Sequence, residues 1–117
     1  MSDAAFIIAE AGVNHNGSME TARRLIHGAR EAGADAVKFQ TFSADRLVTR
    51  SAVKADYQER TSGAAETQHA MLKRLELTPE QVRTLLRWCN EEEIRFLSTP
   101  FDEASVDLLD ELDLPLF

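Results

Sequence analysis

The sequence lacks most of the features that mark secreted, membrane-bound or nucleic-acid-binding proteins. Its single cysteine, Cys89, excludes an internal disulfide and is typical of a reducing compartment. Met1 is followed by neither a basic stretch nor a long apolar run, so no signal peptide and no membrane span are expected. A net charge of −7 argues against nucleic acid and anionic membranes as partners, because both bind basic patches. We therefore expect a cytoplasmic protein.

The short motifs of several large enzyme classes are absent as well. The sequence contains no Walker phosphate-binding loop, no dinucleotide-binding fingerprint and no Gly-x-Ser-x-Gly elbow. Its His, Cys, Asp and Glu residues do not have the spacing of metal ligands, so no metal site is predicted in this chain. The length of 117 residues and the hydrophobic share of 44% do allow one domain-sized core.

Three apolar runs that each end in polar residues are the main positive signal. They predict strands near residues 6–9, 36–39 and 95–99, and residues 114–117 look like the start of a fourth. The first run indicates a strand buried on both faces, as in parallel sheets. Polar groups at the carboxyl ends of parallel strands share one rim, which is where α/β folds place their chemistry. This convergence favours an enzyme.

Helical periodicity and capping residues predict helices between the strands, at residues 19–32, 67–75, 79–92 and from 103 onward. Their expected N-caps are Ser18, Thr78 and Asp102, with Gly33 ending the first helix and Gln81 completing a capping box in the third. The apolar faces should comprise Ala22, Leu25, Ile26 and Ala29, then Val82, Leu85, Leu86 and Cys89, and finally Val106, Leu109 and Leu112. Residues 43–66 show no periodicity and are predicted to form a functional or disordered loop.

The order of these elements predicts an α/β fold with parallel strands and right-handed crossover helices. Three strands and the start of a fourth cannot close a barrel of eight, so we interpret the chain as the N-terminal portion of a TIM (β/α)8 barrel. That interpretation places the helices on one face of the sheet only. A complete small open sheet is the alternative, and a doubly wound domain would have helices on both faces.

Two charged residues lie within or just after the apolar runs. Glu10 follows the first run, where a carboxylate is either functional or a hydrogen-bonding group for the loop at Asn14 and His15. Lys38 interrupts the second run, and lysine is rarely buried unless it is paired or functional. It could serve as a Schiff-base nucleophile or as a cation for phosphate or carboxylate, whereas on an exposed edge strand it would be a solvated charge.

Other candidates flank these two residues. Gln40 lies on the same side of its strand as Lys38 and suits a polyhydroxylated ligand, although a polar strand end is nearly as good an explanation. Residues 98–101 place a hydroxyl and backbone donors before a helix, as an anion site or as a plain turn and cap. His15 could be a ligand, an acid or a group that organises its loop.

Three of these segments together resemble the sialic acid synthase family, which includes the N-acetylneuraminate, legionaminate and pseudaminate synthases. The segments are residues 8–17 (IAEAGVNHNG), 33–41 (GADAVKFQT) and 96–102 (FLSTPFD), together with the helix end at 71–77 (MLKRLEL). Their order and spacing match, and the resemblance spans nearly the whole chain. It implies that residues 1–117 are the N-terminal part of a TIM-barrel domain. The rest of the barrel and a small antifreeze-like domain would lie outside this chain, in a domain-swapped homodimer.

The resemblance also implies a transferase of sialic acid biosynthesis, which condenses phosphoenolpyruvate with an open-chain N-acetylated amino sugar such as N-acetylmannosamine. Lys38 and Thr99 would hold phosphoenolpyruvate, and Glu10 would act near the sugar, with Glu10 and Lys38 as the catalytic residues. Gln40 and Phe101 would line the sugar pocket. Asn14, His15 and Asn16 are expected to be the residues that organise the loop after the first strand.

The resemblance further implies a divalent metal, Mn or Mg, whose two histidine ligands lie outside this chain. A second active-site lysine and later anion-binding serines would lie outside it too, so the isolated chain is expected to be inactive. The family's sugar-contacting asparagine has no counterpart at residues 61–66, which leaves the identity of the sugar open. Two other hypotheses stand beside this one, an aldolase-type barrel in which Lys38 forms a Schiff base and a non-catalytic half-barrel for assembly or binding.

Overall fold

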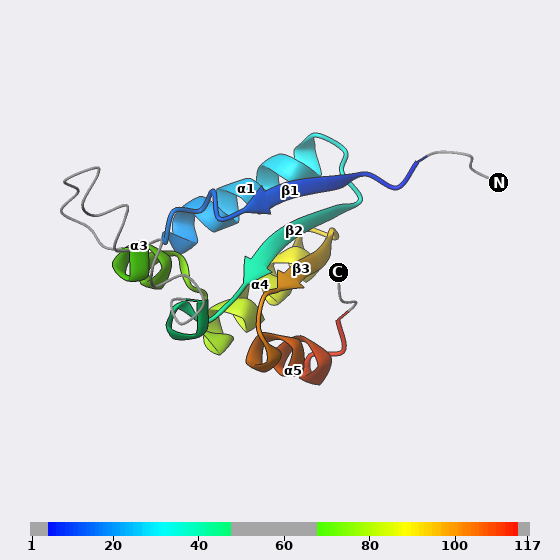
Figure 1. Ribbon diagram of the computed structural model, residues 1–117. Coiled ribbons are helices and arrows are strands. Elements are labelled where there is room, and N and C mark those ends of the chain that lie inside the picture. Colours follow the sequence, from blue (N-terminus) through cyan, green and yellow to red (C-terminus); the bar gives the residue numbers. More distant parts are fainter. Residues whose placement is uncertain (1–4, 48–67, 115–117) are drawn as a thin grey trace.

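The computed structural model describes residues 5–47 and 68–114, which form a three-stranded parallel sheet with helices packed against it (Figure 1). The sheet order is β1 (Ile8–Gly12), β2 (Ala36–Thr41) and β3 (Arg95–Pro100). All three predicted strands are confirmed. The predicted fourth strand falls mainly on residues 115–117, outside the described residues.

The first strand differs from the prediction in its limits and in its burial. It starts at Ile8 rather than at residue 6, and Phe6 and Ile7 are each more than half exposed. The prediction that this strand is buried on both faces was wrong for the described part of the chain, because Ile8 and Glu10 are exposed while Ala11 is buried. The physical reason is that β1 lies at the edge of this sheet, and the packed helices cover only one of its faces.

A bulge interrupts the pairing of β1 with β2. Glu10 lies opposite Lys38, but the next pair joins Gly12 to Phe39, so Ala11 is an extra residue on β1. Strands β2 and β3 then pair without interruption over their whole length. Because side chains alternate along a strand, Lys38 and the residues in phase with it lie on the face opposite to Phe39.

The helices of the structure are α1 (Met19–Glu31), α3 (Gln68–Leu75), α4 (Pro79–Glu91) and α5 (Glu103–Glu111). Each predicted N-cap is confirmed, since Ser18, Thr78 and Asp102 accept a hydrogen bond from the backbone three residues on. The capping box of α4 is also present. Residues 44–47 form a helical turn where a loop was predicted, and residues 48–66 of that loop lie outside the described residues.

The hydrophobic core lies between one face of the sheet and the helices α1, α4 and α5. Its buried members from the sheet include Val37, Phe39 and Phe96, and the rings of the two phenylalanines stack with centroids 5.9 Å apart. The helices contribute Ala22, Ile26, Ala29, Val82, Leu85, Cys89 and Leu109. In the described residues the helices therefore pack on a single face, as the barrel interpretation predicted.

The face of α5 was predicted with one error. Leu109 is buried and Leu112 packs against the core, but Val106 does not belong to this cluster and Ser105 is buried instead. Residues 105, 109 and 112 lie on one helical stripe. Val106 lies to the side of this stripe, and an apolar side chain there does not have to face the core.

Polar contacts join α1 to the end of α4. His27 Nδ1 lies 2.7 Å from Glu92 Oε2, and His27 Nε2 lies 3.5 Å from Glu31 Oε1. The side chain of Arg30 donates a hydrogen bond to the carbonyl of Glu92 at 2.9 Å. The hydrogen bond with Glu92 raises the pKa of His27, with further contributions from the charges of Glu92 and Glu31.

The raised pKa of His27 predicts a pH-dependent contribution to stability. The folded state binds this proton more tightly than the unfolded chain, so the contribution is fully present below the ordinary pKa of 6.5. It is lost as the pH rises through the raised value. We therefore expect His27→Gln to lower the melting temperature at about pH 6 and to have less effect at about pH 8.5.

The matched control for this prediction is Arg24→Gln, which removes the exposed 2.9 Å ion pair with Glu20 on the same helix. That pair contains no histidine, the residue type that acts as a switch near neutral pH, so the effect of Arg24→Gln on the melting temperature should be the same at both pH values. A pH-independent effect of His27→Gln would contradict the prediction.

None of the helices in the described part of the chain is both long and apolar enough to cross a membrane.

Candidate functional site

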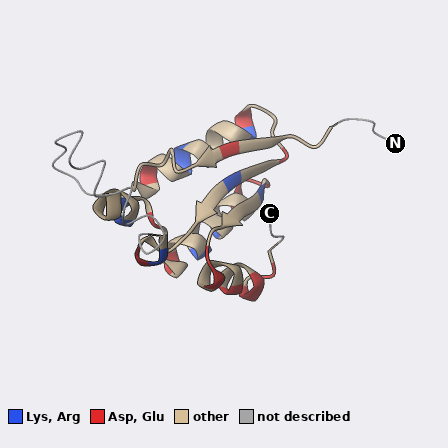
Figure 2. Ribbon diagram, viewed as in Figure 1, with Lys and Arg blue, Asp and Glu red and all other residues tan. Residues whose placement is uncertain are grey.

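The centre of the candidate site is an ion pair between neighbouring strands. Lys38 Nζ on β2 lies 3.2 Å from Glu10 Oε2 on β1, directly opposite in the strand register. Figure 2 shows this basic position of β2 beside the acidic position of β1. The Lys38 side chain is 26% exposed and that of Glu10 is 55% exposed. The two charges are thus held together at a surface that a ligand can reach.

Gln40 lies close to this ion pair, beside Gly12. Gly12 has a φ of +54°, and a Cβ on it would lie 3.5 Å from Glu10 Oε1 and 3.6 Å from Gln40 Nε2. The side chains of Glu10 and Gln40 therefore both lie against Gly12. The structure brings Glu10, Lys38 and Gln40 together on the sheet face opposite to the core.

The third strand adds one hydroxyl to this face. Thr99 lies opposite Gln40 in the register of β2 and β3 and is partly buried. Ser98, one residue earlier, is fully buried, and its Oγ lies 2.6 Å from Thr41 Oγ1. Of the hydroxyl side chains of Ser98 and Thr99, that of Thr99 therefore lies on the same face of the sheet as Lys38.

Phe101 lies just beyond the end of β3. Its backbone N–H donates a 3.0 Å hydrogen bond to the carbonyl of Thr41, which extends the contact between the two strands by one residue. The ring is 43% exposed and available for contact with a ligand.

The structure places His15 away from the ion pair. Its ring is 1% exposed and packs against Phe39, with ring centroids 6.2 Å apart, on the core side of the sheet. His15 Nδ1 accepts a 3.0 Å hydrogen bond from the backbone of Gly17. Burial lowers the pKa of His15, which favours the neutral ring. These contacts tie the His15 ring to the loop between β1 and α1 and keep it on the core side of the sheet.

Backbone hydrogen bonds form the rest of this loop. The N–H of Asn14 donates to Ala11, and that of Asn16 donates to Val13, both at 2.9 Å. Asn16 has a φ of +54°, a left-handed conformation that asparagine tolerates better than most residues. The loop is thus a series of tight turns between β1 and α1.

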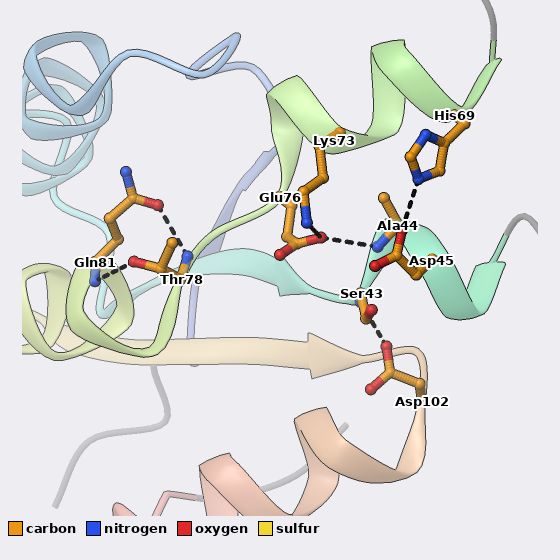
Figure 3. A network of polar contacts seen from close by, with 9 residues as sticks. All are labelled: Ser43, Ala44, Asp45, His69, Lys73, Glu76, Thr78, Gln81 and Asp102. Carbon is orange, nitrogen blue, oxygen red and sulfur yellow. Dashed lines mark hydrogen bonds and ion pairs between the residues drawn. The ribbon is translucent and has the colours of Figure 1, made fainter.

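Sequence reasoning missed a network of polar contacts beside the site, shown in Figure 3. The backbone N–H of Ser43 donates to Asp102 Oδ2 at 2.6 Å, and that of Ala44 donates to Glu76 Oε1 at 2.9 Å. His69 Nε2 also lies 2.6 Å from Asp45 Oδ1. The sequence indicated Asp102 only as a helix cap, and no local signal pointed to contacts between residues so distant along the chain.

A metal site is not formed by the described residues. Residues 5–47 and 68–114 include no group of three or more His, Cys, Asp and Glu side chains that could hold a metal ion.

Comparison with known proteins gives consistent matches. A sequence model described as the NeuB family matches residues 25–117. The N,N'-diacetyllegionaminic acid synthase of Legionella pneumophila is 53% identical over 104 residues, which cover 89% of this chain and 29% of that protein. The human N-acetylneuraminate-9-phosphate synthase is 38% identical over 113 residues, which cover 96% of this chain and 31% of that protein.

Solved structures agree with these sequence matches. The N-acetylneuraminic acid synthetase of Leptospira borgpetersenii, crystallised with citrate, superposes with a TM-score of 0.73 at 31% identity. The match covers 97% of this chain and 35% of that one. The chain thus spans about a third of the length of the proteins it matches, which agrees with the prediction that it is one portion of a larger (β/α)8 barrel.

Proposed function

Since the chain belongs to the NeuB family, we propose that the protein carrying it is a phosphoenolpyruvate-dependent nonulosonic acid synthase. This transferase would join phosphoenolpyruvate to the open-chain aldehyde of an N-acetylated amino sugar and release phosphate. The Legionella and human relatives support a product of the sialic or legionaminic acid type. The observation that carries the proposal is the Glu10–Lys38 pair on the ligand-accessible face of the sheet.

The site has the charges that this substrate pair requires. Phosphoenolpyruvate is a multiply charged anion, and the ammonium of Lys38 would offset its charge while the hydroxyl of Thr99 donates to it. When the anion binds, Lys38 would turn from Glu10 toward it, so the ion pair keeps the ammonium in place before the substrate arrives.

The sugar would bind on the Glu10 side of the anion. The carboxylate of Glu10 can accept hydrogen bonds from sugar hydroxyls and can exchange a proton with the oxygen of the aldehyde. Gln40, which lies against Gly12 beside Glu10, would hydrogen-bond to the sugar. The exposed ring of Phe101 would pack against an apolar part of it. In the bond-forming step, C3 of phosphoenolpyruvate would attack the aldehyde carbon, and water would then displace phosphate from C2.

Several parts of the proposed enzyme lie outside this chain. A divalent ion, Mn or Mg, is proposed from the family resemblance alone, with ligands elsewhere in the protein. The remainder of the barrel, an antifreeze-like domain and a homodimer are proposed on the same basis. A cytoplasmic location is proposed from the sequence, whose single cysteine is typical of a reducing compartment.

The test is an assay of the full-length protein with phosphoenolpyruvate, a manganese salt and an acceptor, either N-acetylmannosamine or a diacetamido sugar. We expect release of inorganic phosphate that depends on one of the acceptors, and formation of a new nonulosonic acid detected by mass spectrometry. Absence of phosphate release with every acceptor would overturn the proposal. Borohydride treatment with substrate present distinguishes the aldolase hypothesis from the synthase proposal, because only an imine at Lys38 would be trapped as a covalent adduct.

A further inference from the structure

Two consecutive backbone amides after β2 are each held by a carboxylate from another part of the chain. Asp102 Oδ2 accepts from Ser43 at 2.6 Å, and Glu76 Oε1 accepts from Ala44 at 2.9 Å. Figure 3 shows the two carboxylates reaching these amides from different elements, Asp102 from the start of α5 and Glu76 from the segment between α3 and α4. Ala44 is fully buried, so its backbone N–H needs a partner within the protein, and Glu76 supplies it.

Asp102 uses both of its oxygens. Oδ1 caps α5 by accepting from Ser105 at 2.8 Å, while Oδ2 holds Ser43, which begins the helical turn at residues 44–47. A carboxylate is favourable at the amino end of a helix, and here one side chain serves two such ends at once. Asp102 thereby joins the residues after β2 to those after β3.

Phe101 depends on this junction more than the other candidate residues do. Lys38 and Thr99 lie within the paired strands, so their positions are set by the strand ladder. Phe101 lies one residue beyond β3, where its backbone N–H donates to the carbonyl of Thr41 and its neighbour in sequence is Asp102. A shift of Asp102 would therefore move Phe101 while leaving Lys38 in place.

We propose that Asp102, supported by Glu76, is a positioning residue that sets Phe101 for contact with the acceptor sugar. This inference rests on the proposed function. It goes beyond that function because neither carboxylate needs to touch a substrate. Glu76 acts indirectly, since its bond to Ala44 holds the preceding amide of Ser43 where Asp102 can accept from it.

The experiment compares steady-state kinetics of the full-length wild type and Asp102→Asn with both substrates. Asparagine keeps an oxygen that can cap α5 but cannot accept from both amides as the carboxylate does. We expect KM for the sugar to rise about tenfold while KM for phosphoenolpyruvate changes less than about twofold, because only the sugar contact is displaced. In a Phe101→Ala background, Asp102→Asn should add little to the sugar KM, because it acts through that ring.

Two further positions control for a loss of stability. Thr78→Ala removes the N-cap of α4, whose hydroxyl bonds to Gln81, and should leave the ratio of the two KM values unchanged. Glu76→Gln keeps an oxygen that can accept from Ala44 and should behave like the wild type, whereas Glu76→Ala should raise the sugar KM. The comparison of Glu76→Ala with Glu76→Gln also provides the test if Asp102→Asn does not fold.

The outcomes are distinct. Equal changes in both KM values, or full additivity with Phe101→Ala, would overturn the positioning role while leaving the proposed function intact. A wild-type protein that releases no phosphate with any acceptor would overturn the proposed function, and this inference with it.

Discussion

Replacing Lys38 with alanine in the full-length protein is expected to lower kcat/KM for phosphoenolpyruvate by roughly 30- to 1000-fold. The reason is the loss of a charge-assisted contact worth ~2–4 kcal/mol at a position where the side chain is only 26% exposed to water. Binding of the anion in the ground state and in the transition state should weaken together. Initial rates over a range of phosphoenolpyruvate concentrations measure this effect.

Two further substitutions serve as controls for this experiment. Lys38→Arg should restore activity only in part, because guanidinium is larger and planar. Glu10→Gln should lower kcat with little change in KM for phosphoenolpyruvate, since Glu10 is proposed to act on the sugar. Unchanged phosphoenolpyruvate kinetics in Lys38→Ala would show that Lys38 is structural and that the proposed anion site is wrong.

The second large effect is expected in the core. Phe39→Ala should lower the free energy of unfolding by about 3–5 kcal/mol, because it removes a fully buried ring and leaves a cavity. The ring is central to the packing, since it stacks on Phe96 and also supports the buried His15. Denaturant titration of the full-length protein, followed by circular dichroism, measures the loss.

Phe101→Ala is the matched control, because it removes the same ring from a position that is 43% exposed. Its effect on the free energy of unfolding should be well below that of Phe39→Ala. If the two substitutions destabilised the protein equally, the assignment of Phe39 to the core and of Phe101 to the ligand-accessible region would be wrong.

Local signals accounted for most of the fold. The cap residues Ser18, Thr78 and Asp102 define helix starts because their side chains bond to amides only three residues away. The alternation along β2 likewise predicted that Lys38 and Gln40 share a face. Such features depend on neighbours in sequence, so a single sequence contains them.

Features that depend on distant parts of the chain were not predictable in this way. The double role of Asp102 requires Ser43, which is 59 residues away, to lie beside it. The prediction that both faces of β1 are buried failed because an apolar run does not reveal which of its faces a neighbouring element will cover. Residue types likewise gave no reason to separate His15 from Glu10, although the structure places them on different sides of the sheet.

That separation falls within one short segment, which contains the bulge at Ala11 and the turn after β1. With one residue more on β1 than on β2, the pairing of the two strands shifts between Glu10 and Gly12, so that Gly12 and not Ala11 lies opposite Phe39. Glu10 keeps the phase of Lys38, whereas the turn that carries His15 leaves toward Phe39. One short segment of the chain thus carries an exposed carboxylate, which we propose acts on the sugar, and a few residues later an imidazole that is buried on the core side of the sheet.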